Sequence, residues 1–168
     1  MASILSRMSV GVAGDVSRPS ATVESMLIDS AAPPTRFGQF CKLVAGKLQP
    51  CTLAGDVAEG VNVGLSVRPF PSPNPAGTSQ GMGAGSPPAS GILDVMRRGY
   101  MTVVQKGSGS PVKGSAVYLC TTAGGAMALG DIVNAASPGS SAAGTLVPGA
   151  TFQGVPDAQG NVEIAFNL

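Results

Sequence analysis

Histidine and tryptophan are both missing from this 168-residue chain, and only 11% of its residues are charged. Without an imidazole the chain lacks Ser–His and Cys–His nucleophile pairs, histidine metal ligands and the commonest general base. No phosphate-binding glycine motif is present either, because the glycine-rich run at residues 81–85 stands in a loop with no apolar helix after it. The sequence therefore predicts a protein that is not an enzyme and that uses no cofactor.

The carboxylates do not indicate a catalytic pair. The aspartates are isolated from one another and mostly stand beside glycine or in turn-forming surroundings, where Asp commonly bonds to the backbone. They are Asp15, Asp29, Asp56, Asp94, Asp131 and Asp157. We predict turn roles for them, and we name no catalytic, cofactor-binding or metal-binding residue.

Charge is balanced as well as scarce, with 10 basic and 9 acidic residues and a net charge of +1. A nucleic-acid partner calls for clustered lysine and arginine, whereas this chain has one adjacent basic pair, Arg97-Arg98. We expect no nucleic-acid partner. Because soluble domains usually carry about 25% charged residues, the low share favours a surface that is largely covered by protein partners.

The cysteines are odd in number and form no CxxC pair, so the sequence predicts no zinc site. Cys41 and Cys120 lie in apolar strand-like runs, which is typical of buried free thiols. A Cys41–Cys51 disulfide remains an alternative. No apolar run reaches the length of a membrane span, about 18 residues, or forms a signal peptide. We expect a soluble protein that is made inside the cell, with no membrane partner.

Residues 1–36 are predicted to form an extended arm with one short strand. Gly, Ser, Pro and Ala dominate this part, its one firm apolar pattern covers residues 23–28, and Pro33-Pro34 ends any regular element. We interpret residues 1–22 as the extended stretch of the arm. The Pro/Gly-rich residues 71–90 cannot build a core and are predicted to form a long exposed loop.

Residues 37–168 are predicted to form the body, because apolar and polar residues alternate there with the period of two that strands show. Val162, Ile164, Phe166 and Leu168, for example, should share one face of a strand that ties the C-terminus into the sheet. Strands are expected at 37–44, 61–68, 91–95, 100–104, 115–120, 150–153 and 162–168. Turns at 45–47, 106–111 and 156–161 and a small-residue loop at 134–144 separate them. The pattern predicts an all-β fold, a jelly-roll-like β-sandwich or barrel.

One stretch resembles an enzyme. Gly91-Ile92-Leu93-Asp94, with Arg98-Gly99 and Val103 after it, is similar to the nucleoside-binding hairpin of trimeric dUTP pyrophosphatases, which are jelly-roll proteins. In that family a tyrosine packs beneath the deoxyribose, and the corresponding residue here is Arg97. The family's Arg-Ser phosphate motif and its Gly-rich tail after an aromatic residue are also missing. This activity is therefore the least favoured alternative.

A longer resemblance covers residues 35–168. The chain resembles bacteriophage capsid cement (decoration) proteins, which bind the outside of a capsid and staple neighbouring major-capsid subunits. The stretches that carry it are 37–40, 64–71, 94–103, 111–118, 149–152 and 161–168. The resemblance implies a β-sandwich or jelly-roll-like body, the major capsid protein as partner, and self-association as a homodimer or homotrimer. It also implies a place on the capsid exterior after assembly in the host cytoplasm.

We expect residues 1–36 and 71–90 to supply much of the capsid contact, because both segments have low complexity and no core pattern. Arms of this kind lose entropy when they order on a capsid but span several subunits. The alternative of another class is a tail or fibre subunit that binds host glycans. Sugar sites usually present several aromatic rings, whereas this chain has only Tyr100 and Tyr118 as tyrosines.

Overall fold

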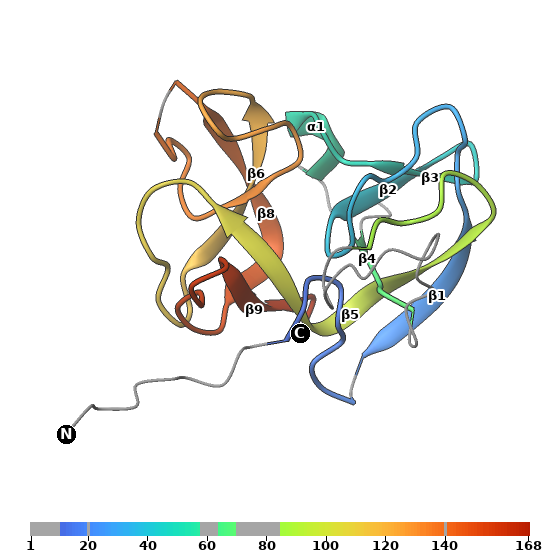
Figure 1. Ribbon diagram of the computed structural model, residues 1–168, viewed down its shortest axis with the longest axis horizontal. Coiled ribbons are helices and arrows are strands. Elements are labelled where there is room, and N and C mark those ends of the chain that lie inside the picture. The colour runs from blue at the N-terminus through green and yellow to red at the C-terminus, as the bar shows by residue number, and fades with distance from the viewer. Residues whose placement is uncertain (1–10, 20, 58–63, 70–84, 140) are drawn as a thin grey trace.

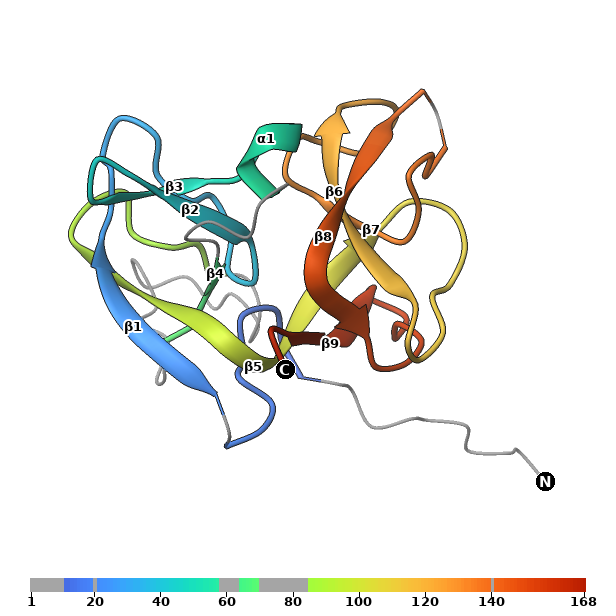
Figure 2. The ribbon, with the colours of Figure 1, turned by 180° about the vertical axis from the view of Figure 1, so that it is seen from behind.

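The protein consists of two β lobes that lie side by side and share one long strand, β5 (Ile92–Lys106) (Figure 1; Figure 2). The computed structural model describes residues 11–19, 21–57, 64–69, 85–139 and 141–168. Residues 1–10 of the expected arm and residues 71–84 of the expected loop lie outside these ranges. One short helix, α1 (Ala54–Val57), stands between the lobes within the described part.

The N-terminal lobe is a strongly curved sheet. Its strands are β1 (Thr22–Leu27), β2 (Phe40–Val44), β3 (Lys47–Pro50) and β4 (Gly64–Ser66), together with the first half of β5. The order is β1-β5-β4-β2-β3, and a bridge between Ile28 and Leu48 brings β3 back to the end of β1. The sheet therefore curls into an almost closed ring, which meets itself only where β1 ends.

The C-terminal lobe is a closed barrel. The second half of β5 pairs with β7 (Ile132–Val133), which pairs with β6 (Ala116–Thr122), and β6 pairs with β8 (Ala143–Phe152). β8 pairs with β9 (Asn161–Phe166), and β9 returns to β5. Closure leaves these strands no free edge, which is the usual way in which barrels avoid edge-to-edge association. The expectation of an all-β barrel or sandwich is confirmed.

β5 corrects one expectation. Two strands were expected at residues 91–95 and 100–104, on either side of Arg97-Arg98-Gly99, but the structure has a single 15-residue strand. Gly99 is the pivot: its φ is +137°, and a Cβ there would stand 2.8 Å from the Cα of Ala21. Only glycine allows this bend without strain, so the strand turns from one lobe into the other without ending.

One buried cluster extends across both lobes. It joins Phe40, Leu65 and Met96 of the N-terminal lobe to residues of the barrel such as Phe152 and Phe166. The rings of Phe40 and Phe166 meet edge to face, with centroids 5.5 Å apart. A second cluster fills the N-terminal ring, and a third lies around Met127 and Tyr118. Because the largest cluster belongs to both lobes, we expect them to unfold together.

Several smaller expectations can be checked directly. All three cysteines are buried and free, so the buried-thiol prediction is confirmed and the Cys41–Cys51 disulfide is not formed. Val162, Ile164 and Phe166 are buried on one face, as predicted. The last residue is different, because β9 ends at Phe166 and Leu168 is 58% exposed.

The described part of the expected arm lies against the body. The segment before β1 follows β5: Gly14 N–H donates to the Thr102 carbonyl, and Ser17 N–H donates to the Tyr100 carbonyl, at 2.9 and 3.0 Å. The short strand expected at residues 23–28 is β1, and it pairs with the first half of β5. From residue 11 onward, the described N-terminal segment is thus bonded to both lobes through β5.

Candidate interaction surface

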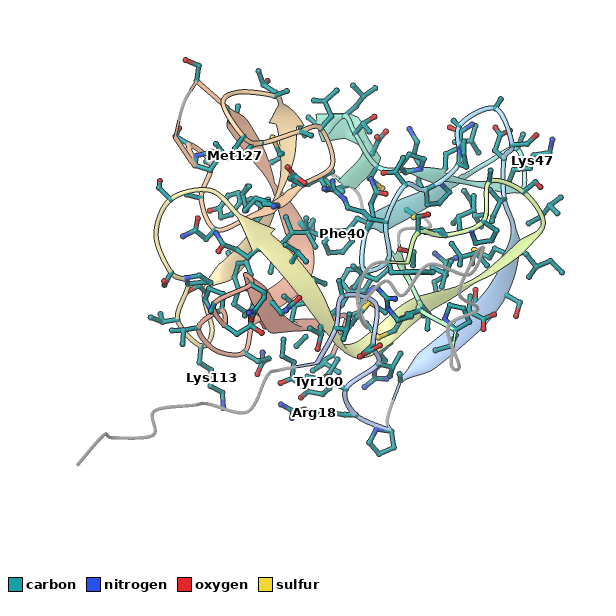
Figure 3. All side chains as sticks on the ribbon, in the orientation of Figure 1. Arg18, Phe40, Lys47, Tyr100, Lys113 and Met127 are labelled. Atoms are coloured by element: carbon teal, nitrogen blue, oxygen red, sulfur yellow. The ribbon has the colours of Figure 1, made fainter. Side chains whose placement is uncertain are left out.

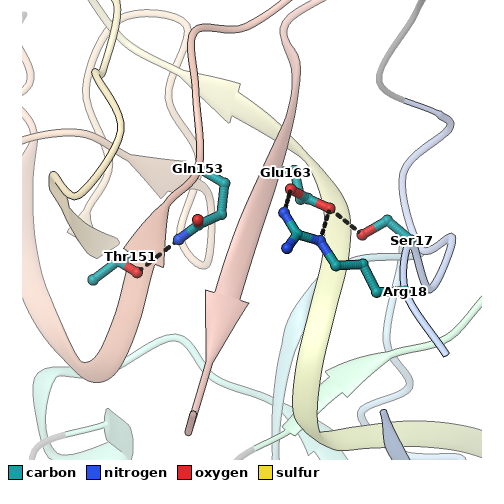
Figure 4. A network of polar contacts seen from close by, with 5 residues as sticks. All are labelled: Ser17, Arg18, Thr151, Gln153 and Glu163. Carbon is teal, nitrogen blue, oxygen red and sulfur yellow. Dashed lines mark hydrogen bonds and ion pairs between the residues drawn. The ribbon is translucent and has the colours of Figure 1, made fainter. Parts of the chain in front are cut away.

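A charged clamp fastens the N-terminal segment to the barrel. Arg18 donates from Nη2 to Glu163 Oε2 at 2.7 Å and from Nε to Oε1 at 3.1 Å, and the Ser17 hydroxyl donates to Oε1 at 2.6 Å (Figure 4). The guanidinium also lies 3.7 Å from the centroid of the Tyr100 ring (Figure 3). The hydrogen bond from Arg18 lowers the pKa of Glu163, and the same bond raises the pKa of Arg18. The contact between β9 and the segment therefore favours the ionised form of Glu163.

The aspartates are mostly turn residues, as the sequence predicts. Each accepts a hydrogen bond from a backbone N–H two to four residues away; they are Asp15, Asp29, Asp56, Asp131 and Asp157. Asp56 also binds Lys42 at 2.6 Å, and Asp131 pairs with Arg36. Asp94 is the exception, because it lies in β5 and accepts from the Ser25 hydroxyl at 2.5 Å. These carboxylates stabilise turns and the pairing of β1 with β5.

A small pocket of about 130 Å³ lies near Arg36 and Arg68. Its lining residues are Ala13, Arg36, Phe37, Gly38, Gln39, Arg68, Gly85, Val104, Gly130 and Ile132. None of these side chains is a carboxylate, thiol or hydroxyl, so this pocket contains no acid–base or nucleophile pair. Within the described ranges no group of three or more His, Cys, Asp or Glu residues could hold a metal ion. No helix among the described residues is long and apolar enough to cross a membrane.

The segment that resembles the dUTP pyrophosphatase motif has a different structure. Residues 92–103 all lie on the continuous strand β5 and form no hairpin. Arg97 Nε lies 3.1 Å from Glu24 Oε2, and Arg98 is the cross-strand neighbour of Thr22. The basic pair Arg97-Arg98 is thus in the middle of a strand.

Three exposed leucines lie on segments that adjoin α1. Leu53 immediately precedes the helix and is 59% exposed, and Leu129 and Leu146 are also exposed. α1 packs against β8, which carries Leu146, and against β6. Gly130 lies against the segment that leads into α1, because a Cβ built on Gly130 would stand 2.8 Å from the carbonyl oxygen of Cys51. Leu129, the preceding residue, is therefore close to the segment that carries Leu53. We call Leu53, Leu129 and Leu146 the α1 surface.

A second exposed apolar group lies on the paired strands β1 and β5. Val23, Leu27 and Ile92 are 42%, 51% and 67% exposed, and Leu27 and Ile92 are cross-strand neighbours. Charged side chains near these groups are paired, as Glu24 is with Arg97 on β1 and β5. The exposed cations Lys47 and Lys113 lie at opposite ends of the molecule (Figure 3). The described surface thus includes these two sets of exposed aliphatic side chains, besides single ones such as Val112.

These features fit a structural protein that packs against other subunits, and the comparisons with known proteins identify the class as phage capsid-associated proteins. The chain belongs to the XM1 gp53 minor capsid protein family, whose model matches residues 1–166. A chain in the solved capsid of Myoviridae phage XM1 has the same fold, with a TM-score of 0.65 at 18% identity over 98% of this chain and 95% of that one. The comparison with curated proteins gave no match.

Family membership supports a structural role in the virion and association with the capsid shell. A structural role of this kind is a non-enzymatic one. The expectation of a phage capsid protein is thereby confirmed. The residues that form the α1 surface and the exposed β1 face were not found from the sequence, because an exposed leucine and a core leucine give the same local pattern.

Proposed function

We propose that the protein is a cement protein, which binds the outer surface of the capsid and joins neighbouring copies of the major capsid protein. The proposal rests on membership of a minor capsid protein family. The structure adds that the two lobes share one core and that aliphatic side chains are exposed outside this core. A stiff body can bridge subunits without deforming, and closure of a lattice multiplies modest single contacts through effective concentration. Assembly takes place in the host cytoplasm.

We further propose that the α1 surface faces the capsid. Aliphatic side chains that a monomer leaves exposed gain free energy when a partner covers them, at about 25 cal/mol for each Å² of apolar area. Lys42 forms an ion pair with Asp56 of α1, so this lysine does not present an unpaired positive charge next to the α1 surface. Low local charge favours close packing against another protein.

The expected arm and loop enter the proposal as additional contacts. We keep residues 1–36 as the arm and 37–168 as the body, with the loop at 71–90. Deleting the whole arm would remove β1 and the Arg18 clamp and would confound folding with binding. The informative deletions are therefore residues 1–10 and residues 71–84, made singly and together.

The test is co-sedimentation with matching capsids assembled without the protein. The wild-type chain should bind saturably at a fixed ratio to the major capsid protein. A triple variant, Leu53→Ser, Leu129→Ser and Leu146→Ser, should bind at least ten-fold more weakly, whereas the control Val112→Ser, which alters another exposed aliphatic residue, should bind normally. Calorimetry confirms that each variant is folded. Failure of the wild-type chain to bind would refute the cement role, and normal binding by the triple variant would refute the assignment of the α1 surface.

A further inference from the structure

Among the residues that the structure describes, no strand covers the outer edge of β1, and the outside of the N-terminal lobe is open there. It pairs with β5 on one side, and its other side meets β3 only through the Ile28–Leu48 bridge at its end. Residues 22–25 are all exposed. In both ribbon views β1 lies at the outer margin of its lobe (Figure 1; Figure 2). An open strand edge is a template for pairing with another chain.

The register shows which backbone groups point outward. Ile28 N–H donates to the Gly91 carbonyl at 2.8 Å, so this is a hydrogen-bonded pair. Antiparallel pairs alternate between bonded and non-bonded, so Met26 and Glu24 also bond to β5. The backbone groups of Val23, Ser25 and Leu27 therefore point away from β5. The contacts to Leu48 occupy the end of the strand, which leaves the edge open from Val23 to the N–H of Leu27.

We propose that this edge pairs with the same edge of a second copy of the chain, antiparallel, around a two-fold axis at Ser25. The two Ser25 residues then exchange both of their hydrogen bonds, and Leu27 N–H donates to the Val23 carbonyl of the second copy, twice by symmetry. Every outward-pointing residue thus meets an outward-pointing residue. If the register were shifted by one residue, the outward-pointing backbone groups would face residues such as Glu24 and Met26. The backbone groups of those residues already bond to β5, so they could not bond to the second copy.

The side chains agree with this register. Val23 of one copy lies opposite Leu27 of the other, next to the exposed Ile92, so each half of the interface forms an aliphatic row. Glu24 faces Met26 of the second copy and not another Glu24, and it already contacts Arg97. Asp94 lies one strand further from the axis and bonds to Ser25. No like charges stand directly opposite each other, so the edge is complementary to itself.

The test combines self-association with site-specific cross-linking. Under mild copper–phenanthroline oxidation, Ser25→Cys should give a disulfide-linked dimer at least ten-fold faster than Thr22→Cys. Hydrogen-bonded cross-strand pairs have Cα atoms about 5.5 Å apart, within the range for disulfides, whereas the Thr22 residues of the two copies are far apart in this register. The native thiols are buried and should not interfere.

Sedimentation velocity over a concentration series gives the second measurement. Leu27→Lys should raise the dimer dissociation constant at least ten-fold, whereas Val112→Lys, at an exposed site elsewhere, should leave it unchanged. Equal cross-linking of the two cysteine variants, a wild-type chain that stays monomeric at every concentration, or a dimer that Leu27→Lys does not weaken would each overturn the proposal. None of these readouts requires a capsid, so they do not depend on the cement role.

Discussion

Replacement of Phe40 by alanine tests whether the two lobes share one core. Phe40 is fully buried in the cluster that spans them and meets Phe166 edge to face. A buried Phe→Ala change lowers the free energy of unfolding by about 3–5 kcal/mol, to which loss of an aromatic pair contributes about 0.5–1.5 kcal/mol. At about 2–4 °C for each kcal/mol in a protein of this size, the melting temperature should fall by roughly 6–20 °C.

Scanning calorimetry and urea unfolding measure this effect. Both the wild-type chain and Phe40→Ala should show a single transition, because neither lobe keeps a complete core without the other. Leu53→Ala, at a mostly exposed leucine, should change the free energy of unfolding by no more than about 0.5 kcal/mol. Two separate wild-type transitions, or a loss below about 1 kcal/mol for Phe40→Ala where about 3–5 is expected, would refute the shared core.

Three further predictions follow from particular contacts. Gly99→Ala should lower the melting temperature more than Gly46→Ala does, since both have positive φ but only the Cβ at residue 99 would meet Ala21; equal shifts would contradict the close contact. The lowered pKa of Glu163 means that its contribution to stability is present above its unfolded pKa and is lost as the pH falls through the folded pKa. The stability difference between wild type and Glu163→Gln should therefore shrink between pH 6 and pH 3 in urea titrations, and a constant difference would exclude the clamp. Burial raises the pKa of Cys51 to about 12 and also raises the pKa of Cys41, so a thiol reagent at pH 8 should react with these residues only on unfolding; rapid reaction in the native state would show that they are accessible.

Local alternation in the sequence predicted the fold class and most strands, because a strand with one buried face alternates apolar and polar residues along the chain. It did not predict the closure of the two rings. β7 is only two residues long, and β3 buries only Leu48, so neither has a readable period. The pairing of β5 with β9 joins segments more than 50 residues apart, which no local pattern encodes. At Gly99 the usual interpretation of glycine as a strand end was wrong, since the bend continues the strand.

The interaction surfaces were less predictable for a physical reason. Exposure depends on what the completed fold covers, so Leu53 and Leu48 look alike in sequence although one is mostly exposed and the other is buried. The strand at residues 23–28 was predicted. Its open edge could not be predicted, because it depends on β3 reaching only the end of β1, at the Ile28–Leu48 bridge. The turn roles of most aspartates could be predicted, because each binds a backbone N–H within four residues of itself.

The most direct test of the cement role is the heat stability of capsids with and without the protein. Matching capsids that lack it are heated in steps, alone or after saturation with the purified chain, and disassembly is followed by light scattering and electron microscopy. The account predicts that decorated capsids survive to a higher temperature and that the gain saturates at the same ratio as binding does. Saturated capsids that disassemble at the same temperature as bare ones would contradict it.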